Sequence, residues 1–327
     1  MGEDCKWVYD PCPLPQPHIN SLVMRLALKV DVDTLQGLRE GVPALMEVLG
    51  ERGVKASFFL ALGPDHSGRA VFRVFRQRGF LTKMLRTRAP AMYSLKTMLY
   101  GTILPAPLIA AAAGEIVPGL FAAGHEVGLH GYDHVLWHDR LMNMNRDQVN
   151  REVTAAQGEF TRLAGRPARA FAAPGWQCSA VSRAVVAAQG FRYASDTRGM
   201  EPYYPRFGAE VTPVLEIPTT LPTLDELLGF TGCGAGDFTD LVLRRLRAGR
   251  PEVLTIHAEV EGGAFRGEFA RLLDRGLEAG VAFFRLADWA EELLTHPGQI
   301  PAAPVYQGRL PGRAGTVSRQ AHPEVGS

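Results

Sequence analysis

The sequence predicts an α/β fold in which strands of a mainly parallel sheet or barrel alternate with helices. Short aliphatic runs recur along most of the chain, and segments with apolar residues at helical spacing separate them. Hydrophobic residues make up 46% of the 327 residues and charged residues 21%, which is typical of a globular protein with a large core. The four cysteines include no C-x-x-C pair, so we expect neither a disulfide framework nor a zinc ribbon, and a reducing compartment is favoured.

The predicted elements alternate between strand and helix from residue 23 to residue 295. The first strand is a largely aliphatic run that ends at Asp33, and apolar residues at helical spacing follow it. Short apolar runs bounded by glycine or proline are typical of buried strands. We expect strands at 23–33, 56–60, 125–129, 168–173, 193–195, 216–217, 253–256 and 281–284. We expect helices at 42–49, 147–163, 269–279 and 288–294.

One catalytic domain over residues 23–295 is expected between two irregular tails. Residues 1–22 are rich in proline and lack a periodic pattern. Residues 296–327 are rich in proline, glycine and arginine, which predicts a loose C-terminal tail. The first residues are acidic and contain no long apolar stretch, so no signal peptide is expected. No run of about 18 uncharged apolar residues predicts a membrane span.

Residues 66–114 interrupt this alternation with a segment that contains no aspartate or glutamate. Cationic residues are interleaved there with aromatic and aliphatic ones, and the cationic set is Arg69, Arg73, Arg76, Arg78, Lys83, Arg86, Arg88 and Lys96. Positive groups on an apolar body are typical of segments that bind an anionic lipid surface, so we predict a membrane-facing insertion. The alternative is an ordinary pair of helices with a solvated basic face. Nucleic acid is not an expected partner, because the whole chain has a net charge of only +1.

Two short motifs, far apart in the chain, predict a metal site. Asp31 and Asp33 end the first strand, where alternation places both side chains on one side. Such strand ends form the active sites of barrels and open α/β sheets. His130 and His134 are spaced i, i+4, so on a helical turn they would share one face as two ligands of one ion. A metal also relieves the repulsion between the carboxylates, since one binds it and the other remains as a general base.

A third histidine, His257, follows the predicted strand 253–256. Its ordinary pKa suits a general acid that protonates a departing amine near neutral pH. Glu259 lies two residues further along and would face the same side if the strand continued. The sequence therefore predicts the groups of a metal-assisted hydrolase.

These motifs resemble those of the polysaccharide deacetylase family, also called the NodB-homology or carbohydrate esterase family 4 fold. Its Asp-Asp motif resembles Asp31-Val-Asp33, its H-x-x-x-H motif resembles His130-Gly-Tyr-Asp-His134, and its late Leu-x-x-His motif resembles Leu254-Thr-Ile-His257. The resemblance implies that Asp31 is the catalytic base and His257 the catalytic acid. It implies further that Asp33, His130 and His134 hold the metal, in a distorted (β/α) barrel with fewer than eight strands.

A narrower resemblance covers most of the predicted domain. Generic members of the family have an Arg-x-Pro-x-Gly motif whose arginine holds the base, whereas this chain has Ala172 at the arginine position. The stretches 33–43, 83–86, 195–199, 221–226 and 255–262 resemble the deformylases of undecaprenyl-phosphate-linked 4-deoxy-4-formamido-L-arabinose, which also depart from that motif. The resemblance implies metal-dependent hydrolysis of the formamide. The products that the resemblance implies are formate and the 4-amino sugar that is used in lipid A modification and polymyxin resistance.

The same resemblance implies the partners of the protein, and positions near the motifs indicate further candidate site residues. A substrate carried on a lipid phosphate implies a peripheral enzyme on the cytoplasmic side of the bacterial inner membrane, docked through residues 66–114. One divalent metal is expected, either zinc, cobalt or manganese, because two histidines and a carboxylate suit each of them. No obligate protein partner is expected. The candidate substrate-binding residues are Trp176, Asp196, Arg198 and Glu259. The alternatives are a core tryptophan at Trp176 and a surface ion pair between Asp196 and Arg198.

Two other functions remain open. A deacetylase of another amino sugar, or another amide hydrolase of this fold, would use the same residues, and the release of formate or acetate separates these activities. A non-catalytic lipid- or sugar-binding module would have the fold without the chemistry. Such a module would be expected to lose metal ligands, whereas here the ligand set is complete, and metal analysis of the purified protein tests it.

Overall fold

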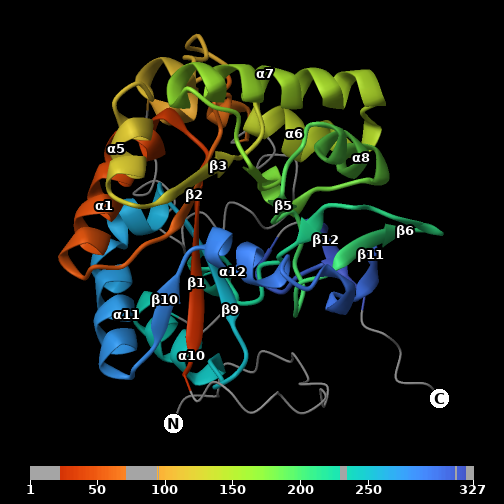
Figure 1. The fold of residues 1–327 in the computed structure, drawn as a ribbon. Coiled ribbons are helices and arrows are strands. Elements are labelled where there is room, and N and C mark those ends of the chain that lie inside the picture. Colours follow the sequence, from red (N-terminus) through yellow and green to blue (C-terminus); the bar gives the residue numbers. More distant parts are fainter. Residues whose placement is uncertain (1–22, 71–93, 95, 229–233, 314, 322–327) are drawn as a thin grey trace.

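A sheet of parallel strands lies at the centre of the computed structural model of this chain (Figure 1). The structure describes residues 23–70, 94, 96–228, 234–313 and 315–321. Within these residues the sheet has eight strands: β1 (Arg25–Val32), β2 (Ser57–Leu60), β3 (Glu126–Leu129), β4 (Ala170–Phe171), β5 (Tyr193–Ala194), β8 (Leu215–Glu216), β9 (Glu252–His257) and β10 (Ala282–Phe284). Each of these strands overlaps a run that the apolar pattern predicts.

The sheet curves into an almost closed barrel. The described strands run in the order β9-β1-β2-β3-β4-β5-β8, all parallel, and β10 pairs only with the first residues of β1. After β8 the backbone N–H groups of Thr220 and Leu221 donate to the carbonyl of Val253 in β9, at 3.2 and 3.1 Å. These two bonds join the ends of the sheet, so the prediction of a distorted barrel with fewer than eight strands in the ring is confirmed.

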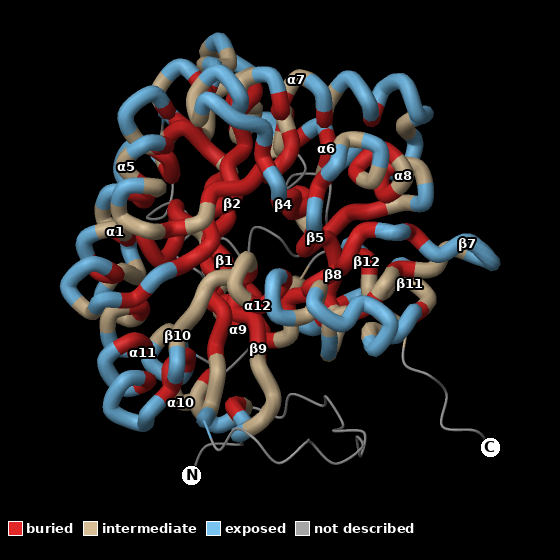
Figure 2. Tube along the Cα trace, in the orientation of Figure 1, coloured by how far each residue is buried: buried red, intermediate tan, exposed pale blue. Residues whose placement is uncertain are grey.

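Helices surround the ring of strands (Figure 1). The strands are buried along most of their length, and the exposed residues gather on the outer sides of the helices (Figure 2). In the part of the chain that the structure describes, the helices are α1 (Val42–Glu51), α5 (Ile116–Ala122), α6 (His134–Arg140), α7 (Arg146–Ala164), α8 (Ala180–Ala188), α9 (Leu224–Leu228), α10 (Phe238–Arg245), α11 (Arg266–Glu278) and α12 (Leu286–Leu293). Short helical turns lie at Gly37–Gly41, Thr97–Leu99, Ile109–Ala112, Leu141–Asn143, Pro174–Trp176, Ala235–Asp237, Val260–Ala264 and Pro297–Gln299.

The longest helix, α7, shows how the sequence sets an element. Asn145 caps its first turn by accepting from the N–H of Gln148, whose side chain accepts from the N–H of Asn145 in return. Gly165 ends the helix at φ 69°, a backbone conformation that glycine adopts without strain. Val153 and Phe160 are buried on the inner face, and burial of this stripe is the main source of helix stability.

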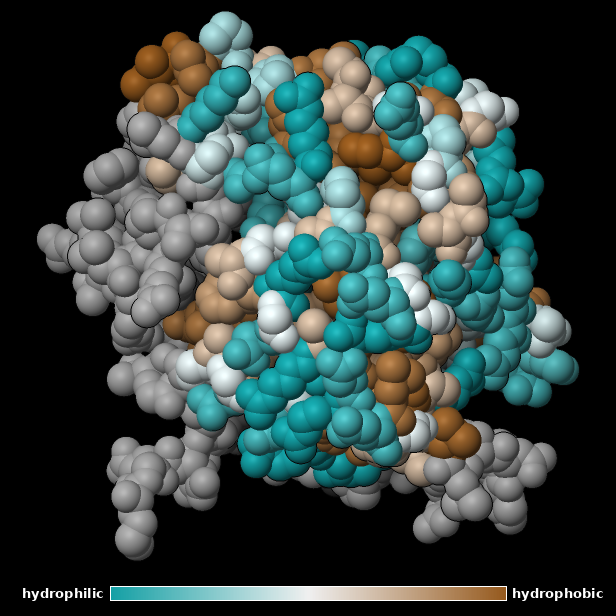
Figure 3. Space-filling model, turned by 90° about the vertical axis from the view of Figure 1, so that its left-hand side faces the viewer, coloured by the Kyte–Doolittle hydropathy of each residue, from teal (hydrophilic) through white to brown (hydrophobic). Residues whose placement is uncertain are grey.

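The side of the molecule formed by α1, α5 and α11 is largely hydrophilic (Figure 3). Ion pairs join the two longer helices there, with Arg52 bound to Asp274 at 2.7 Å and Arg266 bound to Glu47 at 2.8 Å. Exposed pairs of this kind contribute little to stability. The inner faces of these helices pack on the sheet, and this packing holds the helices in place.

One end of the barrel is closed by α12. Its side chains Leu286, Trp289 and Ala290 are buried in the barrel interior with Phe59 and Val253. The helix begins where β2 and β3 begin, because the N–H of Leu286 donates to Ser57 Oγ and that of Ala287 donates to Glu126. Helix α12 therefore covers the amino-terminal ends of the strands, and the opposite end remains for a catalytic site.

The C-terminal residues do not form the loose tail that their composition predicts. Strands β11 (Ala302–Gly308) and β12 (Val317–Gln320) join β6 (Tyr204–Phe207) and β7 (Glu210–Val211) in a second sheet. Leu310 and Val317 are buried, and β12 also bonds through its backbone to Arg198. The prediction was wrong for the strand residues 302–308 and 317–320, because β11 pairs with a strand about a hundred residues earlier. Such a partner leaves no local pattern in the sequence.

One predicted segment lies wholly outside the described residues, and another lies partly outside them. The predicted tail at 1–22 lies outside the described residues, as do residues 71–93 and 95 of the predicted insertion. The described part of the insertion contains the turns Thr97–Leu99 and Ile109–Ala112. Among the described residues, no helix has both the length and the apolar character that a membrane span requires.

Candidate metal centre and active site

The acidic pair lies at the carboxyl end of β1, in the middle of the barrel. Asp31 is in β1 between β2 and β9, where it is 3% exposed, and Asp33 follows the last residue of the strand. His257 ends β9 and is paired in register with Asp31. The strand ends therefore bring together the residues that the sequence predicts for the base, one metal ligand and the acid.

Asp33, His130 and His134 form a compact set of ligands. Asp33 Oδ1 is 3.2 Å from His130 Nε2, and Asp33 Oδ2 is 3.4 Å from His134 Nε2. One ligand atom from each residue lies within 4.8 Å of the others. Asp33 Oδ1 is buried and has no hydrogen-bond partner. Two imidazoles and a carboxylate with an unsatisfied oxygen fit a divalent metal ion, so the donor set agrees with the predicted site.

The electrostatics of the ligand set also suit a cation. Burial alone would raise the pKa of Asp33, but His134, His130 and His257 hold it well below its usual range. Asp33 is therefore ionised, as a metal ligand must be. His130 Nδ1 lies 2.8 Å from the carbonyl oxygen of Ala172, so this nitrogen carries the proton and Nε2 is the atom that could bind a metal.

The two histidines do not lie on one helical turn, contrary to the expectation from their spacing. His130 is in the loop after β3, and His134 is the first residue of α6. Asp133 caps that helix by accepting from the N–H of Leu136 at 3.0 Å, and its other oxygen is 2.6 Å from His66 Nδ1. The loop turns at Gly131, whose φ of 75° favours glycine. A capped helix end and a glycine turn therefore position the ligands.

His257 is placed and charged as a general acid. Its Nδ1 is 3.8 Å from Asp225 Oδ1, and its backbone N–H donates to Glu261 at 2.8 Å. Burial lowers the pKa of His257, but Asp225, Asp33 and Glu261 together raise it to about 9. The imidazole therefore carries its proton at neutral pH. Asp225 was not predicted as a site residue, although it lies in the 221–226 stretch that carries the family resemblance.

Glu259 does not point to the same side as His257, because β9 ends at His257. Its Oε1 accepts from the backbone N–H groups of Asp33 and Thr34, at 3.0 and 2.8 Å, and from the Thr34 hydroxyl at 2.7 Å. A Cβ at Gly37 would lie 2.0 Å from the same oxygen, so any other residue there would displace the Glu259 carboxylate. Glu259 thus fastens the loop after β1 that carries Asp33.

The candidate substrate-binding residues Asp196 and Arg198 are buried, whereas residues that bind a substrate in a cleft would be accessible to it. Asp196 is 1% exposed and pairs with Arg183, whose guanidinium also binds Glu216. Arg198 is 4% exposed and pairs with Glu226. The two residues therefore do not form a surface ion pair with each other, and their contacts are with the core.

Trp176 is 2% exposed and adopts a positive φ of 53°, and its ring NH donates to Thr219. Its ring meets His257 edge-on, with 6.3 Å between the centroids. The guanidinium of Arg313 lies 4.5 Å from the ring centroid. Trp176 is thus a wall of the site beside the acid, and Arg313 reaches it from the loop between β11 and β12.

Comparison with known proteins agrees with this geometry. A family model described as polysaccharide deacetylase matches residues 25–194, which run from β1 to the end of β5. The chain belongs to the polysaccharide deacetylase family. The motifs on which the family resemblance rests are the ones that the barrel brings together, so the predicted family is confirmed.

Curated relatives cover nearly the whole chain. A protein of Shewanella sediminis named "Probable 4-deoxy-4-formamido-L-arabinose-phosphoundecaprenol deformylase ArnD" is 34% identical over 91% of this chain and 95% of its own length. A protein of Wigglesworthia glossinidia brevipalpis with the same name is 29% identical over 87% and 98%. A solved allantoinase structure matches 91% of this chain and 99% of its own, with a TM-score of 0.59 and 17% identity. That likeness concerns the fold.

Proposed function

We propose that this polysaccharide deacetylase family member is a deformylase. Its substrate would be undecaprenyl-phosphate-linked 4-deoxy-4-formamido-L-arabinose, and its products formate and the 4-amino sugar used in lipid A modification. The observation that carries the proposal is the arrangement of Asp33, His130 and His134 next to Asp31 and His257 at one end of the barrel. The names of the two curated relatives support this substrate.

The proposed chemistry is hydrolysis of an amide with separate groups for proton removal and proton delivery. A divalent metal held by Asp33, His130 and His134 would supply Lewis acidity to the formamide oxygen and to water. Asp31 takes the proton from the attacking water, and its Oδ1 is buried without a hydrogen-bond partner, as an accepting atom should be.

Protonated His257 then gives its proton to the amine as the C–N bond breaks. The elevated pKa of His257 keeps that proton in place until the leaving group needs it. Asp225 stabilises the charged imidazole, and Trp176 fixes the plane of the ring by its edge-on contact.

We further propose that the substrate reaches the site from a membrane surface. The described end of the basic insertion lies at the catalytic end of the barrel, because Gln36, close to Asp33, accepts from the Ser94 N–H and the Thr97 hydroxyl at 2.8 and 3.0 Å. Ile103 in this segment is 75% exposed, which is unusual for a large apolar side chain. These observations support docking of this described end of the insertion on lipid, with the active site facing a lipid-borne sugar.

The proposed location is peripheral, on the cytoplasmic face of the bacterial inner membrane. Vesicles with and without anionic lipid test it by co-sedimentation, since a basic segment should bind the anionic vesicles and lose affinity with salt. Ile103→Ser should weaken binding, and Leu277→Ser, at an apolar residue exposed on α11, is the control. Recovery of all the protein in the supernatant at low salt would contradict the proposal.

The substrate assignment is tested by offering the purified protein two lipid-linked sugars that differ only in the acyl group, formamide or acetamide. Release of formate from the first, and little acetate from the second, is expected. A preference for acetamide would favour a deacetylase. Release of neither acid, together with an absence of bound metal, would favour a binding module.

A further inference from the structure

The structure leaves one question about the catalytic base, because position 172 is occupied by alanine where generic family members have an arginine. Ala172 is fully buried, and its methyl group cannot donate to Asp31. A buried carboxylate without a donor or a counter-charge is unfavourable. Another residue must therefore fix Asp31.

Lys29 is in the position to do so. It lies two residues before Asp31 in β1, so alternation places both side chains inside the barrel. Its Nζ is 3.2 Å from Asp31 Oδ2, and both side chains are almost completely buried. The same Nζ donates to the carbonyl of Ser195 in the loop after β5, at 3.2 Å.

Two aromatic rings complete the surroundings of this ammonium group. Its nitrogen is 5.8 Å from the centroid of Phe59 and 5.5 Å from that of Trp176. These contacts stabilise a buried cation and leave it little freedom to turn away from Asp31. Trp176 also meets His257, so the rings that confine Lys29 belong to the walls of the active site.

We propose that Lys29 is the positioning residue for the base in this enzyme, in place of the missing arginine. The ammonium holds Asp31 by Oδ2 and leaves Oδ1, which has no partner, as the atom that accepts the proton. The inference rests on the proposed function only in that Asp31 is the base of an amide hydrolysis. It does not depend on which acyl group is removed.

The test compares Lys29→Met, which keeps the length of the side chain and removes its charge, with Lys29→Arg and with the exposed control Lys55→Met. The measured quantities are kcat and KM for formate and acetate release, the metal content and the thermal unfolding temperature. We expect Lys29→Met to lower kcat by at least about 100-fold with KM changed less than about threefold and one metal ion still bound. Lys29→Arg should recover part of kcat, because it restores the charge.

The possible failures are distinguishable. Wild-type protein that releases acetate but no formate refutes the deformylase assignment and leaves the Lys29 comparison intact. Turnover by Lys29→Met equal to that of Lys55→Met would overturn the positioning role. The positioning role would also be overturned if Lys29→Met lost bound metal and had a lower unfolding temperature, and if these losses explained the whole fall in kcat. That result would indicate a purely structural residue.

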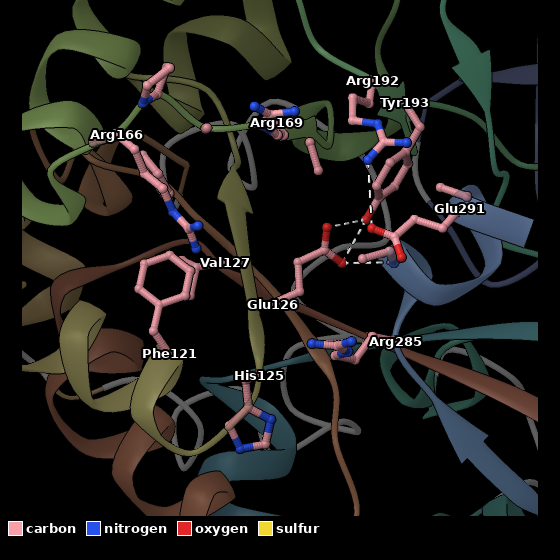
Figure 4. A pocket seen from close by; sticks show the side chains of 16 residues that line it. Phe121, His125, Glu126, Val127, Arg166, Arg169, Arg192, Tyr193, Arg285 and Glu291 are labelled. Carbon is pink, nitrogen blue, oxygen red and sulfur yellow. Dashed lines mark hydrogen bonds and ion pairs between the residues drawn. The ribbon is translucent and has the colours of Figure 1, made fainter. Parts of the chain in front are cut away.

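A separate observation concerns the opposite end of the barrel. A cavity of about 220 Å³ opens there between the starts of β3, β4 and β5 and the first turn of α12 (Figure 4). Four arginines but only two glutamates line it, namely Arg166, Arg169, Arg192, Arg285, Glu126 and Glu291. Apolar side chains also line it, among them Val127, Ala168, Ala170, Ala287 and Ala290.

The carboxylates near this cavity are already engaged. Tyr193 and the N–H of Ala287 donate to Glu126, Glu291 pairs with Arg192 at 3.6 Å, and Arg285 is paired with Asp288. Arg166 and Arg169 have no carboxylate partner among the described residues. The lining residue His125 accepts from the Ala56 N–H through Nδ1, so its Nε2 carries the hydrogen as an uncharged donor.

The geometry points to a second binding site, for a small phosphate monoester with a short apolar group. A guanidinium group can bind a phosphate through two of its N–H groups at once, and the apolar lining residues can contact a few carbon atoms. The catalytic carboxylates lie at the other end of the strands, so this site is separate from the reaction.

Titration calorimetry of the full chain with butyl phosphate and with inorganic phosphate tests this site. We expect saturable binding of both, tighter for butyl phosphate, and at least about tenfold weaker binding in Arg169→Glu. Arg146→Glu, at an exposed arginine on α7, is the control. Equal losses in both variants, or no saturable heat, would overturn the proposal.

Discussion

The loop that carries Asp33 depends on one buried carboxylate, and its removal has a calculable effect. Glu259 Oε1 accepts three hydrogen bonds, from two backbone N–H groups and one hydroxyl. In Glu259→Ala these three donors lose their acceptor at a buried site. Each unsatisfied donor costs about 1–3 kcal/mol, and water that enters the space recovers part of that. We therefore expect a loss of about 3 kcal/mol in the free energy of unfolding.

Thermal unfolding followed by circular dichroism measures this loss. For a chain of this size about 3 kcal/mol corresponds to a fall of roughly 6 °C or somewhat less in Tm. Metal affinity should fall by about 10- to 100-fold as well, because the backbone of a ligand is released. Glu259→Gln keeps an acceptor and should change stability by less than about 1 kcal/mol. Burial and the charge of Asp33 raise the pKa of Glu259 to about 8, so glutamine is close to its protonated form.

The exposed variant Glu278→Ala provides a control for loss of a glutamate as such, and should change stability by less than about 0.5 kcal/mol. A Glu259→Ala protein that unfolds at the wild-type temperature and binds metal normally would refute the reasoning. It would mean that the loop after β1 is held by its other contacts, among them the bond from the Leu35 N–H to Asp65.

Other predictions concern the base, the acid and a buried ion cluster. Asp31→Asn should keep the metal and lose about 10²- to 10⁴-fold in kcat, and near-wild-type turnover would refute its role as base. Asp225→Asn should lower the pKa of His257, so the alkaline fall in rate should move by about one unit to lower pH. Arg183→Met should cost about 3–5 kcal/mol of stability, because Glu216 and its neighbouring carboxylate lose their counter-charge. Burial raises the pKa of Glu216 to about 7, so that loss should be smaller at about pH 5 than at about pH 8, as the native state takes up a proton.

The main elements and the candidate metal ligands could be predicted because their signals are local. A buried strand such as β1 shows as an apolar run, and strand ends in a parallel barrel meet at one edge. The placement of Asp31, Asp33 and His257 follows from these two facts. The sequence also contained an indication of the role of Lys29. A lysine is unusual in an apolar strand, and alternation places its side chain on the same face as the carboxylate two residues later.

Other features depend on contacts between distant parts of the chain. The partners of Asp196 and Arg198 are Arg183 and Glu226, which no spacing rule connects to them. The hairpin of β11 and β12 is held by β6 and by the backbone of Arg198, so a Pro- and Gly-rich segment became ordered. The direction of Glu259 depended on the residue at which β9 ends, and strand ends are the least predictable part of an element.

The most direct test of the central claim is a metal titration of formate release. The protein is stripped with a chelator, mixed with the lipid-linked formamido sugar and titrated with a divalent metal, while formate and the loss of CO from the lipid mass are followed. The account predicts no turnover without metal, full turnover at one equivalent, and no recovery in His130→Ala. Undiminished formate release by the metal-free protein, or by His130→Ala, would contradict it.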